Sequence, residues 1–319
     1  MNQLSEPNIN NEKVFIDVAK SKRFQNEHCK KCDALMPDCE TCTYGNRGKM
    51  LALRERIFER YNFYTQNKNN LDVIRPITNI IGEDEKELLE NSYQSSSIFK
   101  EVKQQLLENI PAGRTGMCPF CMISEPTTFD HYFSESEYPE YIIFAPNLVP
   151  CCSQCNSIKG NRLFSENQRE RKIIHFYYDS LPQMQYLKAA FKVDNKIPQV
   201  SFSLKFEHES EITTIIANHF DTLHLLERYK RQSNDVISTE CEIIKDQLKS
   251  GGTVEEYAKI LKIRANAFQK VNGSNYWKTC IYMAMSESQE QLAKLIYRQS
   301  IERGEVIWTK NCSTHSLRP

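Results

Sequence analysis

The sequence predicts an α+β protein that is mainly α-helical, with a compact module held by cysteines near its middle. Several stretches carry apolar residues at the three- and four-residue spacing of an amphipathic helix, whereas strand-like alternation is confined to short segments. Two CxxC pairs enclose one central loop. Four parts are expected: an N-terminal segment (1–48), a helical region (49–112), the central module (113–172) and a helical C-terminal region (173–319).

Helices are expected on the N-terminal side of the module. Apolar residues recur on one face of "MLALRERIFERYNFY" (50–64) and of "FKEVKQQLLENI" (99–110). Between them, "NIIGEDEKELLE" (79–90) places acidic residues near a helix start, where they complement the helix dipole. "PAGRTG" (111–116) then breaks the pattern and predicts a boundary near residue 112.

The C-terminal part is expected to contain one strand and several helices. "PQVSFSLKFE" (198–207) alternates as a strand does, and periodic apolar residues flank "SGGT" (250–253). Cys241 and Cys280 fall on apolar stretches and are interpreted as core residues. The other histidines match no ligand spacing and are interpreted as structural or solvated: His175, His208, His219 and His224.

Composition narrows the class of protein. A mean hydropathy of -0.58 and 26% charged residues favour a soluble chain, and no apolar run approaches the length of a membrane span. The N-terminus has neither an apolar signal core nor an Arg-rich transit pattern, which predicts a cytoplasmic location without membrane contact. Lys plus Arg (41) equals Asp plus Glu (41), so any nucleic-acid contact would depend on a local basic patch.

In a reducing compartment the clustered cysteines favour metal over disulfides. The first cluster, "HCKKCDALMPDCETC", contains two CxxC knuckles and is a candidate second zinc site. Its ligands would be Cys29, Cys32, Cys39 and Cys42. A purely structural staple is favoured for this cluster, and a small zinc element that touches nucleic acid is the alternative.

The second cluster gives the stronger metal prediction. Cys118 and Cys121 form one knuckle, and Cys152 and Cys155 have the same two-residue separation, so the four thiolates suit one tetrahedral structural zinc. Cys151 does not repeat that separation and is expected to be a buried thiol. Such a zinc would fix the geometry of the chain between the knuckles.

Between the knuckles lie residues suited to phosphodiester hydrolysis. Asp130 and the side-chain oxygen of Asn156 are hard ligands that suit Mg²⁺, and His131 titrates near neutrality and can take a proton from water. Adjacent residues of a strand point to opposite sides, which favours separate roles for Asp130 and His131. A metal that stabilises charge on phosphate, together with a base, is the combination that such hydrolysis needs.

The order Asp-His, "NLVP" and CxxC-Asn-x-x-Lys-Gly, within residues 118–161, resembles the HNH endonucleases, which belong to the ββα-metal or His-Me finger nucleases. The resemblance implies His131 as the general base, Asp130 and Asn156 as ligands of a catalytic Mg²⁺ or Mn²⁺, and Asn147 as a brace for the loop that positions His131. It also implies a ββα-metal module and hydrolysis of nucleic acid, with DNA preferred over RNA.

The surrounding sequence resembles HNH proteins that are paired with ATPases in bacterial antiphage defence, which implies an ATPase partner. One departure stands out, because Ser134 and Glu135 replace the Pro-Lys of such proteins and exchange a cation for an anion. Lys159 and Arg162, three residues apart, are candidate phosphate contacts. The cations that follow are equally consistent with an ordinary solvated face: Arg169, Arg171 and Lys172.

The sequence therefore predicts a metal-dependent endonuclease. Two alternatives stay open. The zinc-stapled module could bind nucleic acid without cutting it, or both cysteine clusters could serve only as scaffolds in a protein-interaction module.

Overall fold

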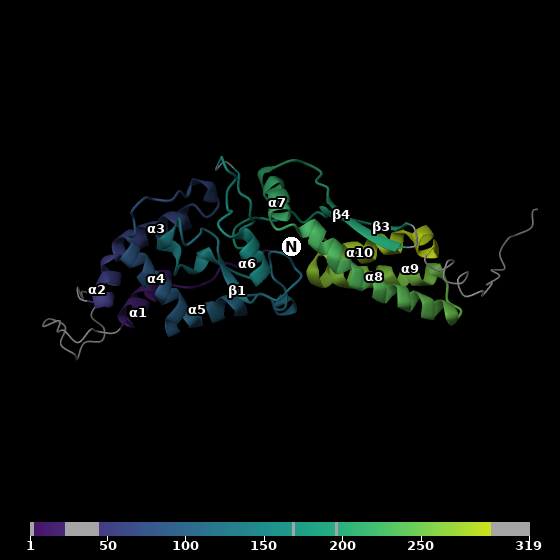
Figure 1. The fold of residues 1–319 in the computed structure, drawn as a ribbon, viewed down its shortest axis with the longest axis horizontal. Coiled ribbons are helices and arrows are strands. Elements are labelled where there is room, and N and C mark those ends of the chain that lie inside the picture. Colours follow the sequence, from purple (N-terminus) through teal and green to yellow (C-terminus); the bar gives the residue numbers. More distant parts are fainter. Residues whose placement is uncertain (1–2, 23–44, 168–169, 195–196, 295–319) are drawn as a thin grey trace, which may run out of the picture. The chain divides into compact units, whose positions relative to one another are not determined.

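The computed structural model describes residues 3–22, 45–167, 170–194 and 197–294. This part of the chain is mixed α/β and mainly helical, as predicted (Figure 1). It divides into two compact units, which are described separately below. The first consists of Met1–Met184 with Phe206–Leu225, and the second of Gln185–Lys205 with Leu226–Pro319, each within its described residues.

The N-terminal part of the first unit is helical. Its helices are α1 (Asn11–Lys20), α2 (Gly45–Ala52), α3 (Arg54–Gln66), α4 (Glu83–Ser95) and α5 (Ser97–Glu108), with short 3-10 turns at η1 (Leu71–Val73) and η2 (Ala112–Arg114). The helix expected over 50–64 is two helices, because the Leu53 N–H bonds to Met50 O in a tighter turn. Leu53 itself is fully buried, so the break lies against the core.

Local capping explains where α4 and α5 begin. The backbone N–H of Gly82 donates to Oε2 of Glu85 (2.8 Å), and the first turn of α4 carries three acidic residues, as expected from its sequence. The Ser96 hydroxyl accepts from the N–H of Phe99 (3.3 Å) and caps α5. The two helices are thus separated by a single capping residue.

The central module has the order strand, strand, helix. Strands β1 (Thr128–His131) and β2 (Leu148–Cys151) pair antiparallel, with Asp130 opposite Val149 and His131 opposite Leu148. The connection contains η3 (Pro139–Tyr141) and η4 (Ala145–Asn147), and α6 (Ser153–Lys159) follows β2 directly. Gly160, at φ +49°, ends α6 and donates its N–H to Asn156 O.

The helical region and the module share one core in the first unit. The ring of Tyr61 in α3 stacks on Phe144 with centroids 4.1 Å apart. Arg60 of α3 donates to Glu140 (2.8 Å), and both side chains are buried. Helix α7 (Glu211–Thr222) belongs to the same unit, and His219 bonds to Phe120 O (2.9 Å). The module is therefore supported by residues from both sides of it in the sequence.

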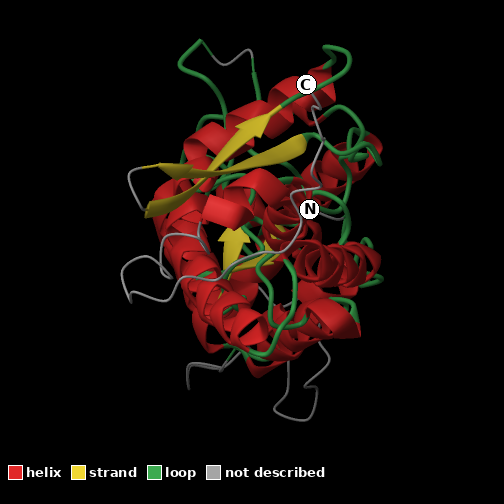
Figure 2. Cartoon of the chain, turned by 90° about the vertical axis from the view of Figure 1, so that its right-hand side faces the viewer, coloured by secondary structure: helices red, strands yellow, loops and turns green. Residues whose placement is uncertain are grey.

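In the part that the structure describes, the second unit combines a hairpin with helices. Strands β3 (Leu187–Asp194) and β4 (Ile197–Leu204) pair antiparallel. Later in the chain come the helices α8 (Leu225–Lys249), α9 (Val254–Asn272) and α10 (Trp277–Glu287). Figure 2 shows the two strand pairs as short two-stranded sheets among helices. The sequence predicts β4 but not β3, whose alanines and lysines do not favour a strand.

The second unit contains two cysteines that the sequence assigns to the core. Cys280 is buried in α10, as expected, whereas Cys241 on α8 is only half-buried. No helix in the described ranges combines the length and the apolar character that crossing a membrane requires.

Candidate active site and zinc cluster

The four cysteines of the central knuckles meet in space. All four are buried, and their Sγ atoms lie within 4.8 Å of one another: Cys118, Cys121, Cys152 and Cys155. A tetrahedral zinc with 2.3 Å bonds would separate its sulfur ligands by about 3.8 Å, and the Sγ atoms of Cys121 and Cys152 are 3.9 Å apart. The predicted grouping is confirmed, and the cluster could hold a zinc ion.

The chemistry of the cluster also suits a cation. Hydrogen bonds from Cys118 first, and then from Cys121 and Cys155, lower the pKa of Cys152. The pKa of Cys121 is lowered to about 7, mainly by its hydrogen bond with Cys118. Burial raises the pKa of Cys118, and the pKa of Cys155 is raised as well, so without a metal the protons are shared unequally among the four thiols. Zinc binds cysteine as thiolate, and its charge would favour that form in all four.

The structure also separates Cys151 from its neighbour Cys152. Cys151 is fully buried and lies outside the group of four, as the spacing predicts, and burial raises the pKa of its thiol. It therefore behaves as a core residue of β2. The N-terminal candidate ligands, Cys29, Cys32, Cys39 and Cys42, lie outside the described residues.

Asp130, at the third position of β1, faces α6. Its Oδ1 is 2.9 Å from Nζ of Lys159, and the two side chains are 2% and 1% exposed. Burial raises the pKa of the Asp130 carboxyl, while the charge of Lys159 acts in the opposite direction. The second oxygen, Oδ2, is buried and has no hydrogen-bond partner among the described residues.

The expected phosphate contact of Lys159 is wrong for this conformation. Its ammonium is buried, and besides pairing with Asp130 it donates to His131 O (2.8 Å). Arg162 does not share a helix face with it, because α6 ends at Lys159. Arg162 is exposed and its guanidinium donates to Ile158 O. The spacing alone could not show that Lys159 turns inward.

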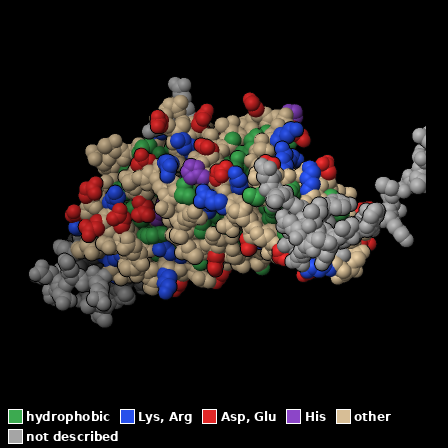
Figure 3. Space-filling model, turned by 45° about the vertical axis from the view of Figure 1, so that its right-hand side comes forward, with side chains coloured by type: hydrophobic (Ala, Val, Ile, Leu, Met, Phe, Trp, Pro, Cys, Tyr) green, Lys and Arg blue, Asp and Glu red, His purple; other side chains and the backbone are tan. Residues whose placement is uncertain are grey.

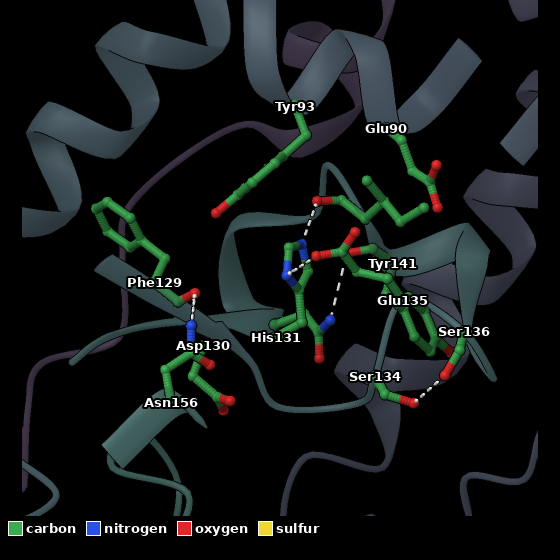
Figure 4. Close-up of polar contacts among 12 residues, drawn as sticks. Glu90, Tyr93, Phe129, Asp130, His131, Ser134, Glu135, Ser136, Tyr141 and Asn156 are labelled. Carbon is green, nitrogen blue, oxygen red and sulfur yellow. Dashed lines mark hydrogen bonds and ion pairs between the residues drawn. The ribbon is translucent and has the colours of Figure 1, made fainter. Parts of the chain in front are cut away.

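Asn156, the predicted metal ligand on α6, lies beside β1. Its amide Nδ2 is 3.4 Å from both Thr128 Oγ1 and Phe129 O, and the side chain is half-buried. Figure 4 shows Asn156 next to Asp130, with His131 and Glu135 grouped separately. The two candidate ligands of the catalytic metal therefore lie on neighbouring elements, with Asn156 hydrogen-bonded to the residue that precedes Asp130.

His131 is held through both ring nitrogens. Nε2 is 2.9 Å from Ile142 O, and Nδ1 is 2.8 Å from Oε1 of Glu135. The ring of Tyr93, from α4, lies over it with centroids 4.7 Å apart (Figure 4). Only 8% of His131 is exposed, so a water molecule has little access to the ring in this conformation.

Asn147 crosses the loop between the strands. Its Oδ1 accepts from the N–H of Phe133 (2.8 Å), and its Nδ2 donates to Phe133 O (3.0 Å) and Tyr141 O (3.3 Å). The side chain is fully buried. These bonds tie the chain just after His131 to the segment that carries Ile142, the partner of the His131 ring.

Two residues at this site escape the sequence reasoning. Glu135 stands out in the sequence only as an anion in place of a cation, yet it binds the candidate base, and hydrogen bonding to His131 lowers the pKa of the Glu135 carboxyl. Tyr93 lies on α4, outside the central module, and no motif of the module indicates it. Lys103 of α5 lies over the Tyr93 ring (3.3 Å to the centroid) and donates to Tyr93 O.

The four histidines that the sequence assigns to structural or solvated roles divide by burial. His175 and His219 are fully buried, and His175 shares a 2.9 Å hydrogen bond with the Tyr64 hydroxyl. Burial lowers the pKa of His175 well below its usual value. His208 and His224 are exposed. The described residues thus fit the structural and solvated roles expected for these four.

Positive and negative side chains are mixed on the face of the molecule that Figure 3 draws. On the face drawn in Figure 3, lysine and arginine side chains form small groups interspersed with acidic ones, with no large continuous basic area. This agrees with the equal numbers of basic and acidic residues in the whole sequence. Strong sequence-independent attraction to a phosphate backbone needs many basic contacts.

Comparison with known proteins gives one distant relative. The chain is 23% identical over 233 residues to protein ea31 of Escherichia phage lambda, an alignment that covers 68% of this chain and 77% of that protein. No protein-family model matches the sequence. No solved structure matches it either.

Proposed function

We propose that this protein is a metal-dependent endonuclease of the HNH type, which hydrolyses phosphodiester bonds in nucleic acid, with DNA the preferred substrate. One observation carries the proposal: Asp130 and His131 are neighbours on β1, and Asn156, which follows the clustered Cys155 on α6, hydrogen-bonds to the carbonyl of Phe129, the residue before Asp130. Donor oxygens for a hard cation next to an imidazole form the minimum set for metal-assisted hydrolysis.

The donor set fits a divalent cation. The buried Oδ2 of Asp130 has no hydrogen-bond partner among the described residues, and the Asn156 side chain hydrogen-bonds to the carbonyl of the preceding residue, Phe129. Asp130 and Asn156 would hold Mg²⁺ or Mn²⁺, which when bound would stabilise negative charge on the phosphate and the leaving oxygen. Lys159 already neutralises Oδ1 of Asp130, so the cation would be taken by the other oxygen.

The chain's own residues supply the proton transfer. Ile142 O fixes the His131 ring through Nε2, so Nδ1 is the nitrogen that would accept a proton from water. The water oxygen then bonds to phosphorus and the bond from phosphorus to the leaving oxygen breaks, while solvent protonates the leaving oxygen. Asn147 keeps the loop that carries Ile142 in place during these steps.

A cleavage assay tests the proposal directly. Purified protein is incubated with plasmid DNA, linear DNA and RNA in Mg²⁺, in Mn²⁺ and in EDTA, and compared with His131→Ala and with the matched control His208→Ala. We expect metal-dependent cleavage of DNA that is lost in His131→Ala and kept in His208→Ala, because His208 is exposed and belongs to neither site. Cleavage that survives His131→Ala would remove the assignment of the base.

A non-catalytic module is the second candidate. The observation that favours it is the closed state of the site, in which both ring nitrogens of His131 and one oxygen of Asp130 are already paired. Retained DNA binding without cleavage in any metal would support a zinc-stapled nucleic-acid-binding module. Absence of both binding and cleavage would support a protein-interaction module.

Regulation by an ATPase partner in antiphage defence is a proposal that rests on the sequence resemblance. Equal numbers of basic and acidic residues suit a nuclease that a partner recruits to DNA. Affinity purification of the tagged protein from its host should recover an ATPase encoded by a neighbouring gene. Recovery of the protein without one would reject this part.

A further inference from the structure

Glu135 makes a contact with the candidate base that the hydrolysis scheme does not use. The carbonyl of Ile142 can only accept a hydrogen bond, so Nε2 of His131 carries a proton. The proton from water must therefore arrive at Nδ1. That atom lies 2.8 Å from the Glu135 carboxylate. An ionised carboxylate can only accept as well, so with this pair formed both ring nitrogens carry protons and the ring has no free lone pair. When Glu135 leaves, the proton on Nδ1 passes to solvent, and only then can this nitrogen accept a proton from the attacking water.

Glu135 is not needed to orient the ring. Ile142 O already holds Nε2, and the Tyr93 ring lies 4.7 Å from the imidazole. Asn147 fixes the backbone on both sides of these contacts. Other groups set the position of the ring, and the Glu135 carboxylate occupies the nitrogen that they leave free. Blocking is therefore a better account of this contact than positioning.

The turn that carries Glu135 is held by backbone hydrogen bonds from Glu137 N–H (3.3 Å) and Tyr138 N–H (2.9 Å) to the carbonyl of the buried Ser134, and by side-chain contacts. The Glu135 side chain is 39% exposed, whereas the side chain of its partner His131 is 7% exposed. Within the turn, Ser134 contacts Ser136 (3.3 Å) and Glu137 (3.5 Å), and Asn161 donates to Ser136 (3.0 Å) at an exposed position. Because the Glu135 side chain itself is partly exposed, it can leave Nδ1 by rotating into solvent while the turn keeps these contacts.

We propose that Glu135 is a tethered block on the candidate base, which must leave Nδ1 of His131 before nucleic acid is cleaved. The inference rests on the proposed function and adds a control to it. A bound phosphodiester is an anion that repels the carboxylate and competes with it for the nearby Lys86 and Lys103, whose charges, after the hydrogen bond to His131, lower the pKa of Glu135. Bound substrate is thus the group that would displace the block.

The test uses Glu135→Ala with Glu137→Ala as its matched control, because Glu137 is an exposed glutamate in the same turn that does not contact His131. Single-turnover cleavage of DNA by the full chain with Mg²⁺ is the first measurement. Labelling by diethylpyrocarbonate, read by peptide mass spectrometry as the ratio of His131 to the exposed His208, is the second. Thermal unfolding of each variant checks that it is folded.

We expect Glu135→Ala to raise both cleavage and the labelling ratio by about three- to tenfold, since it removes one partly exposed charge-assisted contact. Glu137→Ala should match the wild-type protein. If no variant cuts nucleic acid but the labelling ratio rises in Glu135→Ala, the block stands and the proposed nuclease function fails. An unchanged labelling ratio, or slower cleavage by Glu135→Ala, would overturn the block.

Discussion

Lys159 and Asp130 form a buried ion pair that joins α6 to β1, with Nζ and Oδ1 2.9 Å apart and both side chains almost without solvent exposure. The same ammonium donates to His131 O, so one lysine fixes the strand at both candidate catalytic residues. A solvated lysine would be available to substrate, but this one is part of the architecture of the site.

Removing one partner of this pair should destabilise the protein strongly. Lys159→Met leaves the Asp130 carboxylate buried without its counterion, which costs about 3–5 kcal/mol of unfolding free energy. Replacing both partners, in Asp130→Asn with Lys159→Met, should recover part of that loss. Urea unfolding measures both effects, and Arg162→Met, at an exposed position, is the control. A cost below about 1 kcal/mol for Lys159→Met would contradict the structural role.

Zinc should depend on Cys152 and not on Cys151. Cys152→Ala removes one of four ligands and should lower the bound metal by one zinc per chain, because a three-thiolate site holds the ion more weakly. Cys151→Ala shortens a buried side chain but leaves the ligands intact. Metal analysis by mass spectrometry after dialysis compares the two variants. Equal zinc contents would show that Cys152 is not a ligand.

His175 should make stability depend on pH. Burial first, and then the charge of Arg171, lower its pKa well below 6.5. Below about pH 6.5 the unfolded chain therefore binds a proton at His175 that the folded chain does not bind. The unfolding free energy contributed by this group is therefore intact above about pH 6.5 and falls by about 1.4 kcal/mol per pH unit below it, until the folded pKa is reached.

Urea unfolding between pH 5 and 8 measures that slope. His175→Gln should flatten it, although the variant will be less stable because the hydrogen bond with Tyr64 is altered. His208→Gln, at an exposed position, is the control and should keep the wild-type slope. A slope that His175→Gln leaves unchanged would assign the pH dependence to other groups.

The Asn147 side chain should stabilise the loop between β1 and β2 through several hydrogen bonds. Asn147→Ala leaves one N–H and two carbonyls of the loop without their partner, at a cost of about 2–4 kcal/mol. Hydrogen exchange of the Phe133 amide should accelerate in the variant. Asn161→Ala removes an exposed contact with Ser136 and is the control. Unchanged exchange at Phe133 would contradict the bracing role.

Several features could be predicted from the sequence alone, because they depend on residues that are close together in the chain. The CxxC spacing identifies Cys152 over Cys151, because two residues between cysteines shape a knuckle wherever it lies. The acidic start of α4 and the periodic apolar residues of α5 likewise depend on residues close in sequence. Two-residue alternation also explains why Asp130 and His131 face different partners.

The tertiary structure alone decided which groups surround those residues. Lys159 turns inward because a buried Asp130 lies across from α6, and spacing along a helix does not record that pairing. Tyr93 reaches His131 from a helix far away in the sequence, and Glu135 reaches it by the course of a turn. The sequence by itself determined which chemical groups the central module holds. Long-range packing determined which of them are paired, buried or blocked, because burial and ion pairing depend on distance in space.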